Sequence, residues 1–558
     1  MPSQISRYWH TLRHLRPVQL YGRIAFRLAR PRPDTRPAPA VRPLPGPWLP
    51  PARRKPSLTG PRNFCILNVD GSLDEIGWDG PEREKLWRYN QHYFDDLNAL
   101  NAGARSGWHL DLLSDWVAGY PPAIGNGWEP YPTSLRIVNW IKWSLAGNVL
   151  PEPCIESLAV QTRWLTRRLE VHLLGNHLFA NAKALVFAGL FFEGEEAAGW
   201  LSQGLNVLSR QIPEQILADG GQFERSPMYH ALALEDVLDL CNVASAYKGA
   251  LGVHGRELIL DWRDRARLML RWLDTMCHPD GEISFFNDAA MGIAPSPDEL
   301  KAYATRLGIV AAEAPMSITW LESSGYARLV SGPAVLLVDM APVGPDYLPG
   351  HAHADTLSLE FSLFGQRVLV NSGTSCYGDS AERMRQRGTA AHNTVVVDGE
   401  DSSEVWSGFR VARRAMPINP RVVAEEAFEA SCGHDGYRRL PGRVIHRRRW
   451  RLTRTNLEVE DTLQGSYDSA EARFHLHPSS TVTIGDGCGG TICLANGRLL
   501  KWTVVVGSAR VERSTWHPHF GESVPNVCLI VRMKEGRATT RFEWDDERGD
   551  KNAHPVPE

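Results

Sequence analysis

The spacing of apolar residues predicts helices over a long central part of the chain, from about residue 86 to 307. One such segment follows the helix-starting run Pro132-Thr133-Ser134, with apolar positions at Leu135, Val138, Ile141 and Leu145. Further segments with this period cover 155–173, 177–192, 196–211, 230–246, 256–276 and 296–307. Short connectors that carry Gly and Pro separate them, which predicts paired helices in an α/α solenoid or toroid.

From about residue 318 the helical period disappears. Short alternating or apolar runs follow one another and are separated by Gly, Asn, Asp and Pro, as in an antiparallel β-sandwich. The expected fold class is therefore α+β multidomain, with an α/α helical half followed by a C-terminal antiparallel β-sandwich. A cleft between two such halves would suit an elongated ligand.

The first part of the chain follows neither pattern. Residues 1–30 intersperse apolar residues with arginines, and 31–61 contain eleven prolines. The basic segment is expected to pack on the body of the protein, with a membrane-surface helix as the alternative; the proline-rich segment is expected to be an extended connector. We therefore divide the chain into 1–62, a helical domain at 63–315 and a β domain at 316–558.

Composition narrows the function classes. The 558 residues are 43% apolar and 22% charged, and the net charge of −3 gives no overall bias toward nucleic acid. The nine cysteines are scattered without CxxC spacing, so free thiols are expected. No apolar run could cross a bilayer, and no secretory signal is recognisable, so the expected location is cytoplasmic, with periplasmic as the alternative. The oligomeric state is not determined.

Polar segments at the ends of predicted helices and in the β half carry the candidate chemistry. In the helical half they are 175–177 (GNH), 219–230 (DGGQFERSPMYH) and 280–288 (DGEISFFND). Within them, Asn176 is either a helix cap or a functional amide, and Tyr229 is either a boundary aromatic or a proton-transfer group. In the β half, His351 and His353 share a face if they lie on a strand, and with a third histidine they could bind a metal or transfer protons.

This residue set suits β-elimination better than glycoside hydrolysis. Hydrolysis needs two carboxylates that flank the scissile bond, and the spacing of the acidic residues singles out no such pair. In a uronic acid the C5 proton becomes acidic once the neighbouring carboxylate is neutralised, which Asn and His donors can do. A tyrosine can then transfer protons without any cofactor.

The order of these motifs resembles the heparinase II/III-like polysaccharide lyases. The likeness runs from about residue 86 to 478 and includes GNH (175–177), DGGxFERSPxYH (219–230), GHAHAD (350–355), VNSG (370–373) and AHN (391–393). The resemblance implies an incomplete (α/α) toroid followed by the β-sandwich. It also implies a lyase acting on an acidic, uronic-acid-containing polysaccharide.

Roles follow from the resemblance residue by residue. Asn176 and His351 are expected to neutralise the carboxylate, with Tyr229 transferring the proton and His177 assisting. Substrate contacts are expected from four further residues, Arg225, Tyr377, His92 and Glu224.

The family also implies a structural zinc in the β half. His353 and His392 match its ligands, but Asn371 stands where the family has Asp, and neutral Asn is a poor zinc ligand. Three outcomes stay open: a weak site, a site completed by Asp355 or water, or hydrogen bonds in place of the metal.

Two alternative functions remain. One is a uronate epimerase, which returns the C5 proton to the opposite face and makes no unsaturated sugar. The other is a non-catalytic glycan-binding or assembly protein of exopolysaccharide production. The absence of a recognisable export signal suggests the handling of a self-made polymer. The uronic acid, the linkage, the sulfation and the endo or exo mode are not determined.

Overall fold

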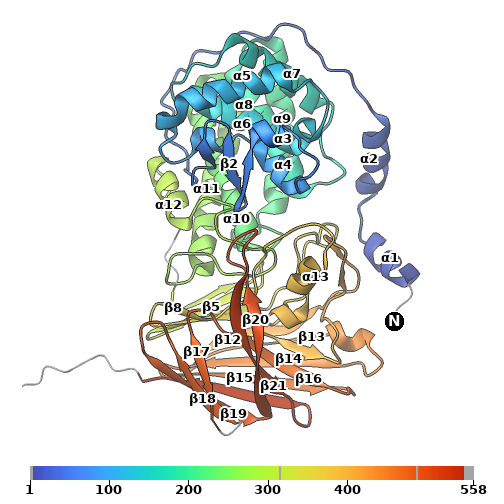
Figure 1. The fold of residues 1–558 in the computed structure, drawn as a ribbon, viewed down its shortest axis with the longest axis vertical. Helices are drawn as coiled ribbons and strands as arrows, with labels where there is room; N and C mark the ends of the chain where they lie inside the picture. The colour runs from blue at the N-terminus through green and yellow to red at the C-terminus, as the bar shows by residue number, and fades with distance from the viewer. Residues whose placement is uncertain (1–3, 313–315, 486–487, 546–558) are drawn as a thin grey trace, which may run out of the picture.

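The computed structural model describes residues 4–312, 316–485 and 488–545. It consists of a helical half and a β half, stacked along the long axis of the molecule (Figure 1). The predicted fold class is therefore confirmed. Within the described residues, no helix is both long enough and apolar enough to span a membrane.

The helical half is built from helices packed side by side, in which α6 packs on α8, α8 on α9 and α10 on α11. Its main helices are α3 (Leu73–Ile76), α4 (Lys85–Gln91), α5 (Ser106–Gly119), α6 (Pro130–Leu145), α7 (Glu152–Thr166), α8 (Gly175–Phe191), α9 (Gly194–Gln215), α10 (Pro227–Ala246), α11 (Val253–Met276) and α12 (Pro297–Arg306). The predicted helices correspond to α6–α12. However, the segment expected to be helical to residue 173 ends at Thr166, and a turn follows.

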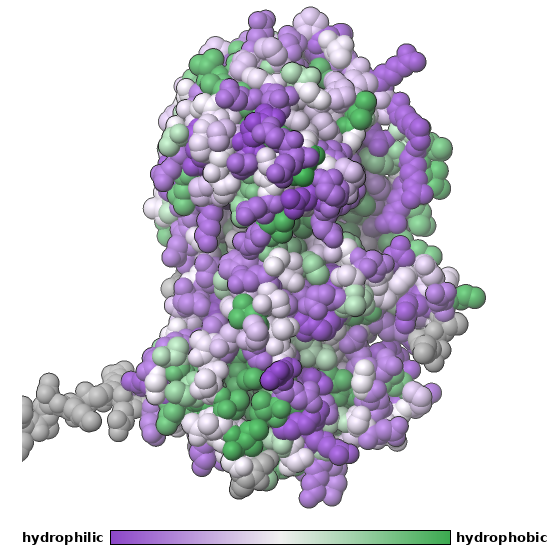
Figure 2. All heavy atoms as spheres, viewed as in Figure 1, coloured by the Kyte–Doolittle hydropathy of each residue, from purple (hydrophilic) through white to green (hydrophobic). Residues whose placement is uncertain are grey.

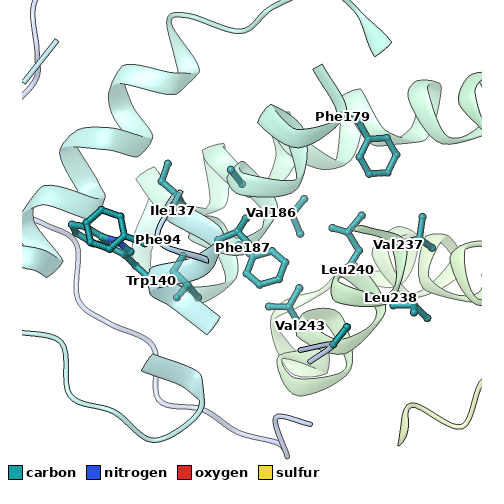
Figure 3. Packing of buried hydrophobic residues seen from close by; sticks show 14 of the residues in the cluster. Phe94, Ile137, Trp140, Phe179, Val186, Phe187, Val237, Leu238, Leu240 and Val243 are labelled. Carbon is teal, nitrogen blue, oxygen red and sulfur yellow. The ribbon is translucent and has the colours of Figure 1, made fainter. Parts of the chain in front are cut away.

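Large apolar side chains fill the space between these helices. Trp140 of α6, Phe187 of α8 and Leu240 of α10 are fully buried and belong to one cluster (Figure 3). Helix α8 is mostly apolar and is buried along nearly its whole length, as a central helix should be. Its rigid position determines where its first turn, with Asn176, lies.

The β half contains three main antiparallel sheets. One has the order β12 (Pro417–Ala424), β13 (Phe428–His434), β14 (Ile445–Leu452), β15 (Asn456–Gln464), β22 (Arg537–Glu543), β19 (Leu499–Val506), β18 (Gly489–Cys493) and β17 (Thr481–Ile484). A second has the order β20 (Ser508–Trp516), β21 (Val524–Arg532), β16 (Ala470–His475) and β9 (Val395–Val397). The third is a meander of β4 (Ile318–Leu321), β5 (Tyr326–Ser331), β6 (Ala334–Asp339), β7 (Leu359–Leu363) and β8 (Gln366–Leu369).

One apolar core joins the three sheets. Phe361 of β7, Trp450 of β14 and Phe474 of β16 are fully buried within it. Strand β14 alternates buried and exposed residues, so it faces this core on one side only. Between the strands lie helix α13 (Ala381–Arg387) and the short pair β10 (Val405–Trp406) and β11 (Arg410–Val411). Helix α13 lies on the side of the sheets toward the helical half (Figure 1), and β10 packs on it.

The start of the chain forms an arm beside both halves. Helices α1 (Gln4–Leu12) and α2 (Pro17–Leu28) lie along one side of the molecule (Figure 1), and the connector then leads to the hairpin strands β1 (Leu58–Gly60), β2 (Asn63–Ile66) and β3 (Val69–Ser72). The predicted boundary at 62/63 falls inside the β1–β2 turn, since Leu58 pairs with Phe64. Residue 315, at the second predicted boundary, lies outside the described residues.

Candidate active site

A cavity of about 1160 Å³ opens where the two halves and the arm meet. The structure brings six of the residues predicted from the sequence together in its lining: Asn176, His177, Glu224, Tyr229, His351 and Tyr377. The first four come from the helical half and the last two from loops of the β half. The site therefore exists only where the two halves are in contact.

The first turn of α8 supplies Asn176 and His177. Leu174 and Gly175 adopt left-handed φ values of 64° and 55°, which turn the chain sharply into the helix. The N-cap position is Leu174, so Asn176 lies within the first turn and is not the cap. Its side chain is free to face the cavity.

His177 is held by a carboxylate on the preceding turn. Its Nδ1 lies 3.0 Å from Glu170 Oε1, and its ring packs on Tyr131 with centroids 4.5 Å apart. Burial lowers the pKa of His177, but the Glu170 charge outweighs burial, and the net pKa is raised. An imidazolium at this position can attract a negatively charged sugar.

Glu224 is buried and lies beside His351. Its Oε2 is 3.7 Å from His351 Nε2 and has no hydrogen-bond partner among the described residues. Burial raises its pKa, although His351 and a hydrogen bond from Gln222 act in the opposite direction. A carboxyl group with a raised pKa is a hydrogen-bond donor over a wider pH range than an ordinary glutamate.

Tyr229 opens α10, where the Ser226 hydroxyl caps the helix by accepting a hydrogen bond from the Tyr229 N–H. The Tyr229 hydroxyl lies 2.9 Å from the Tyr377 hydroxyl, and its ring lies against His351 with centroids 3.9 Å apart. Burial, the neighbouring Tyr377 hydroxyl and the charge of Asp288 raise its pKa well above the ordinary value of 10. Tyr229 is therefore a protonated phenol at neutral pH.

Asp288 positions His351 from below the cavity. It is fully buried and accepts hydrogen bonds from His351 Nδ1 at 2.9 Å, His353 Nε2 at 2.8 Å and the Arg383 guanidinium at 2.8 Å. Burial alone would raise its pKa, but Arg383 and the two histidines hold it well below its usual range. The ionised carboxylate fixes the proton of His351 on Nδ1, so Nε2 faces Glu224.

Two residues expected to contact substrate lie outside the cavity lining. His92 is fully buried in the helical core, where its Nδ1 accepts a hydrogen bond from Trp116 Nε1 at 3.1 Å and burial lowers its pKa to about 3. Arg225 donates to the Ser324 carbonyl at 3.0 Å, and its own carbonyl accepts from Tyr326. His92 is therefore a core residue, and Arg225 joins the two halves. Neither side chain reaches the surface that faces the cavity.

The three expected zinc ligands lie in the β half, behind Asp288. His353 Nδ1 and His392 Nε2 are 3.2 Å apart, and Asn371 Oδ1 accepts a hydrogen bond from the Asn393 N–H at 3.1 Å. Asp355 Oδ2 accepts a hydrogen bond from the Asn287 N–H at 2.8 Å. Across the described ranges, no three His, Cys, Asp or Glu side chains are grouped to hold a metal. Two imidazoles and an engaged neutral amide do not fit a structural zinc site, which takes four ligands.

Sequence reasoning missed the residues that support the lining. Glu170 lies in a turn without a motif, and Arg383 lies on α13, which no pattern predicted. Asp288 was visible only as the end of a polar connection. The contact of Glu170 with His177 is local but lies outside any motif, whereas 95 positions separate Arg383 from Asp288.

Two solved structures of lyases have folds similar to this one. Heparinase III has a similar fold, with a TM-score of 0.68 and 16% sequence identity over 86% of this chain and 81% of that chain. A heparan sulfate lyase from Pedobacter heparinus also has a similar fold, with a TM-score of 0.58 and 17% identity over 95% of this chain and 88% of that chain. The fold is thus that of polysaccharide lyases with an α/α toroid and a β-sandwich.

The sequence comparisons give the family. The family model described as "Heparinase II/III N-terminus" matches residues 154–305, and "Heparinase II/III-like, C-terminal" matches 314–545. The chain belongs to the heparinase II/III-like family. Heparin-sulfate lyases of Bacteroides stercoris and Pedobacter heparinus are each 26% identical, over 42% and 41% of this chain. These matches span only 38% and 36% of the length of those relatives.

Proposed function

We propose that the protein is a polysaccharide lyase that cleaves an acidic, uronic-acid-containing polysaccharide by β-elimination. The observation that carries this proposal is the convergence of Asn176, His177 and Glu224 with the Tyr229–His351 pair on one cavity. The names of the related heparin-sulfate lyases support a glycosaminoglycan-like polymer as the first substrate to test.

Asn176, His177 and Glu224 form the group that neutralises the uronate. The Asn176 amide and the His177 imidazolium can each donate a hydrogen bond to a carboxylate, and Glu224 can do so in its protonated form, which burial favours. Donors in a partly buried cavity stabilise the enolate-like charge that develops when C5 loses its proton. Glu224 thereby acquires a role in neutralisation that was expected of His351.

His351 and Tyr229 form the proton-transfer pair. The His351 Nδ1–H donates a hydrogen bond to Asp288, so the Nε2 lone pair is the base that removes the C5 proton. The C4–O4 bond then breaks, a C4–C5 double bond forms, and the Tyr229 hydroxyl protonates the leaving oxygen. Transfer of the proton from His351 to the Tyr229 phenolate restores both groups.

The placement of this pair favours elimination over epimerisation. An epimerase needs its base and its acid on opposite faces of the sugar ring. Here the rings of Tyr229 and His351 lie against each other, so both groups approach from the same side. Removal of the C5 proton and protonation of the leaving oxygen on one side give a syn elimination.

Ultraviolet absorbance of the unsaturated product tests the proposal on heparan sulfate, hyaluronan, alginate and bacterial exopolysaccharides. Tyr229→Phe is expected to reduce the wild-type rate about 10²- to 10⁴-fold, since it removes one proton-transfer group. Tyr247→Phe is the matched control, because Tyr247 is buried, lies outside the cavity lining and has no hydroxyl partner among the described residues. Glycan binding by a folded wild type, without absorbance on any polymer, would instead favour the binding protein.

A further inference from the structure

The arm formed by α1 and α2 carries an apolar outer surface. In α2, Leu20, Ile24 and Leu28 are 51%, 62% and 77% exposed and recur every four residues along one stripe. In α1, Ile5 and Trp9 are 81% and 65% exposed and share a face in the same way. A helix that merely packs on a protein body would place such residues inward.

The opposite faces of both helices are attached to the body. The Trp406 Nε1–H donates to Thr11 Oγ1 at 3.1 Å, and the Gln19 amide donates to the Tyr347 carbonyl at 3.0 Å. In α2, Gly22 is buried, and Phe26 packs on His172 with centroids 4.4 Å apart. The body therefore holds the helices in the orientation that exposes the apolar stripe.

The arm is also strongly basic. Residues 4–33 contain seven arginines and no acidic residue, although the whole chain has a net charge of −3. In α2, Arg23 and Arg27 are exposed and flank the apolar stripe, and Arg30 just after α2 is also exposed. Figure 2 shows hydrophilic and hydrophobic side chains next to each other on this side of the molecule.

We propose that the outer face of α1 and α2 binds an anionic lipid surface. Apolar side chains would enter the boundary between headgroups and acyl chains, and the arginines would contact lipid phosphates or other anionic headgroups. A second copy of this surface is disfavoured because it would oppose two clusters of arginines. A polyanionic glycan would use the arginines but would leave Ile24 and Leu28 in water.

The proposed surface lies next to the catalytic cavity. Leu15, Gln19 and Arg23 of the arm line that cavity, while the apolar stripe of α2 points away from it. A protein bound through the arm would hold its cavity near the lipid surface. The substrate would then be an acidic polymer located at a membrane.

Co-sedimentation with vesicles tests this proposal. The full chain is expected to bind phosphatidylcholine vesicles that contain about 30% phosphatidylglycerol, but not pure phosphatidylcholine. Binding should weaken when salt is raised from about 0.1 M to about 1 M, because the Debye length falls from about 10 Å to about 3 Å.

Paired variants separate the two contributions. Ile24→Ser with Leu28→Ser is expected to weaken binding about 10- to 100-fold, and Arg27→Gln with Arg30→Gln about 30-fold. Val149→Ser with Leu260→Ser is the control, since those side chains are 82% and 64% exposed elsewhere on the helical half. The control should bind vesicles like the wild type, and all three variants should keep their fold and lyase activity.

Several outcomes would overturn the proposal. One is equal binding of the wild type to neutral and anionic vesicles. Another is unchanged vesicle binding of the Ile24→Ser, Leu28→Ser variant. A fall in molecular mass of the Ile24/Leu28 variant in analytical ultracentrifugation would instead assign the surface to a second copy. Loss of heparan sulfate binding in the arginine variant, without any vesicle binding by the wild type, would assign it to a glycan.

Discussion

Glu170 determines the charge of the histidine that faces the cavity. It lies 3.0 Å from His177 and also accepts a hydrogen bond from Asn181. Burial opposes protonation of His177, but the carboxylate raises its pKa above the ordinary value of 6.5. His177 therefore keeps its positive charge to higher pH than an isolated imidazole, which favours binding of a uronate.

The pH profile of kcat/KM checks this role. If the imidazolium is the active form, activity falls as pH rises through the raised pKa. Glu170→Gln removes the charge but keeps an oxygen for Asn181, so the pKa falls and the alkaline limb moves to lower pH. Glu156→Gln on α7 is the control and should leave the limb in place. An unmoved limb in Glu170→Gln would contradict the assignment.

The loop between β8 and α13 carries a neutral residue where the family has an aspartate. Asn371 lies between β8 and α13, in the region where His353 and His392 meet, and its amide is neutral and buried. The expectation of a structural zinc stays a prediction of the resemblance, and this donor set argues against it. An aspartate at this position would add a charged ligand to the two imidazoles.

Asn371→Asp is therefore expected to create zinc affinity. After incubation with zinc and desalting, the variant should retain about one zinc per chain and the wild type far less. A chelator should lower the Tm of the variant only. Asn526→Asp, at another buried asparagine, serves as the control and should gain no metal. A stoichiometric zinc in the wild type would show that Asn371 is a competent ligand.

Across the whole molecule, Asp288 joins the two halves at the site. It lies between α11 and α12, while His351, His353 and Arg383 belong to the β half. The arrangement links the catalytic geometry to the contact between the halves. The β-sandwich contains a similar network remote from the cavity, in which Asp461 binds His446 and Arg448.

Asp288→Asn and Asp461→Asn form a matched pair. Each leaves a buried arginine without its charge partner and is expected to cost about 3–5 kcal/mol of stability. Only Asp288→Asn should also lower kcat at a temperature where both variants are folded, because it releases His351. Thermal unfolding and single-turnover rates separate the two effects. Equal kcat values in the two variants would reduce Asp288 to a structural residue.

The linear pattern was sufficient for the fold class and for six residues of the cavity lining. Helical and alternating periods report which faces are buried, and they located both halves. Short motifs at helix starts identified Asn176, His177 and Tyr229, because the chemistry of those residue types is local.

Tertiary structure alone decided which of these groups can act together. Only packing showed that His92 is core, that Arg225 holds the halves together, and that Glu170 and Asp288 control the two cavity histidines. It also showed that the arm packs on the body, as expected, but through the faces opposite the apolar stripe, which stays exposed. Distances between residues far apart in the chain, and the pKa changes that burial causes, are properties of the folded whole, which no local pattern encodes.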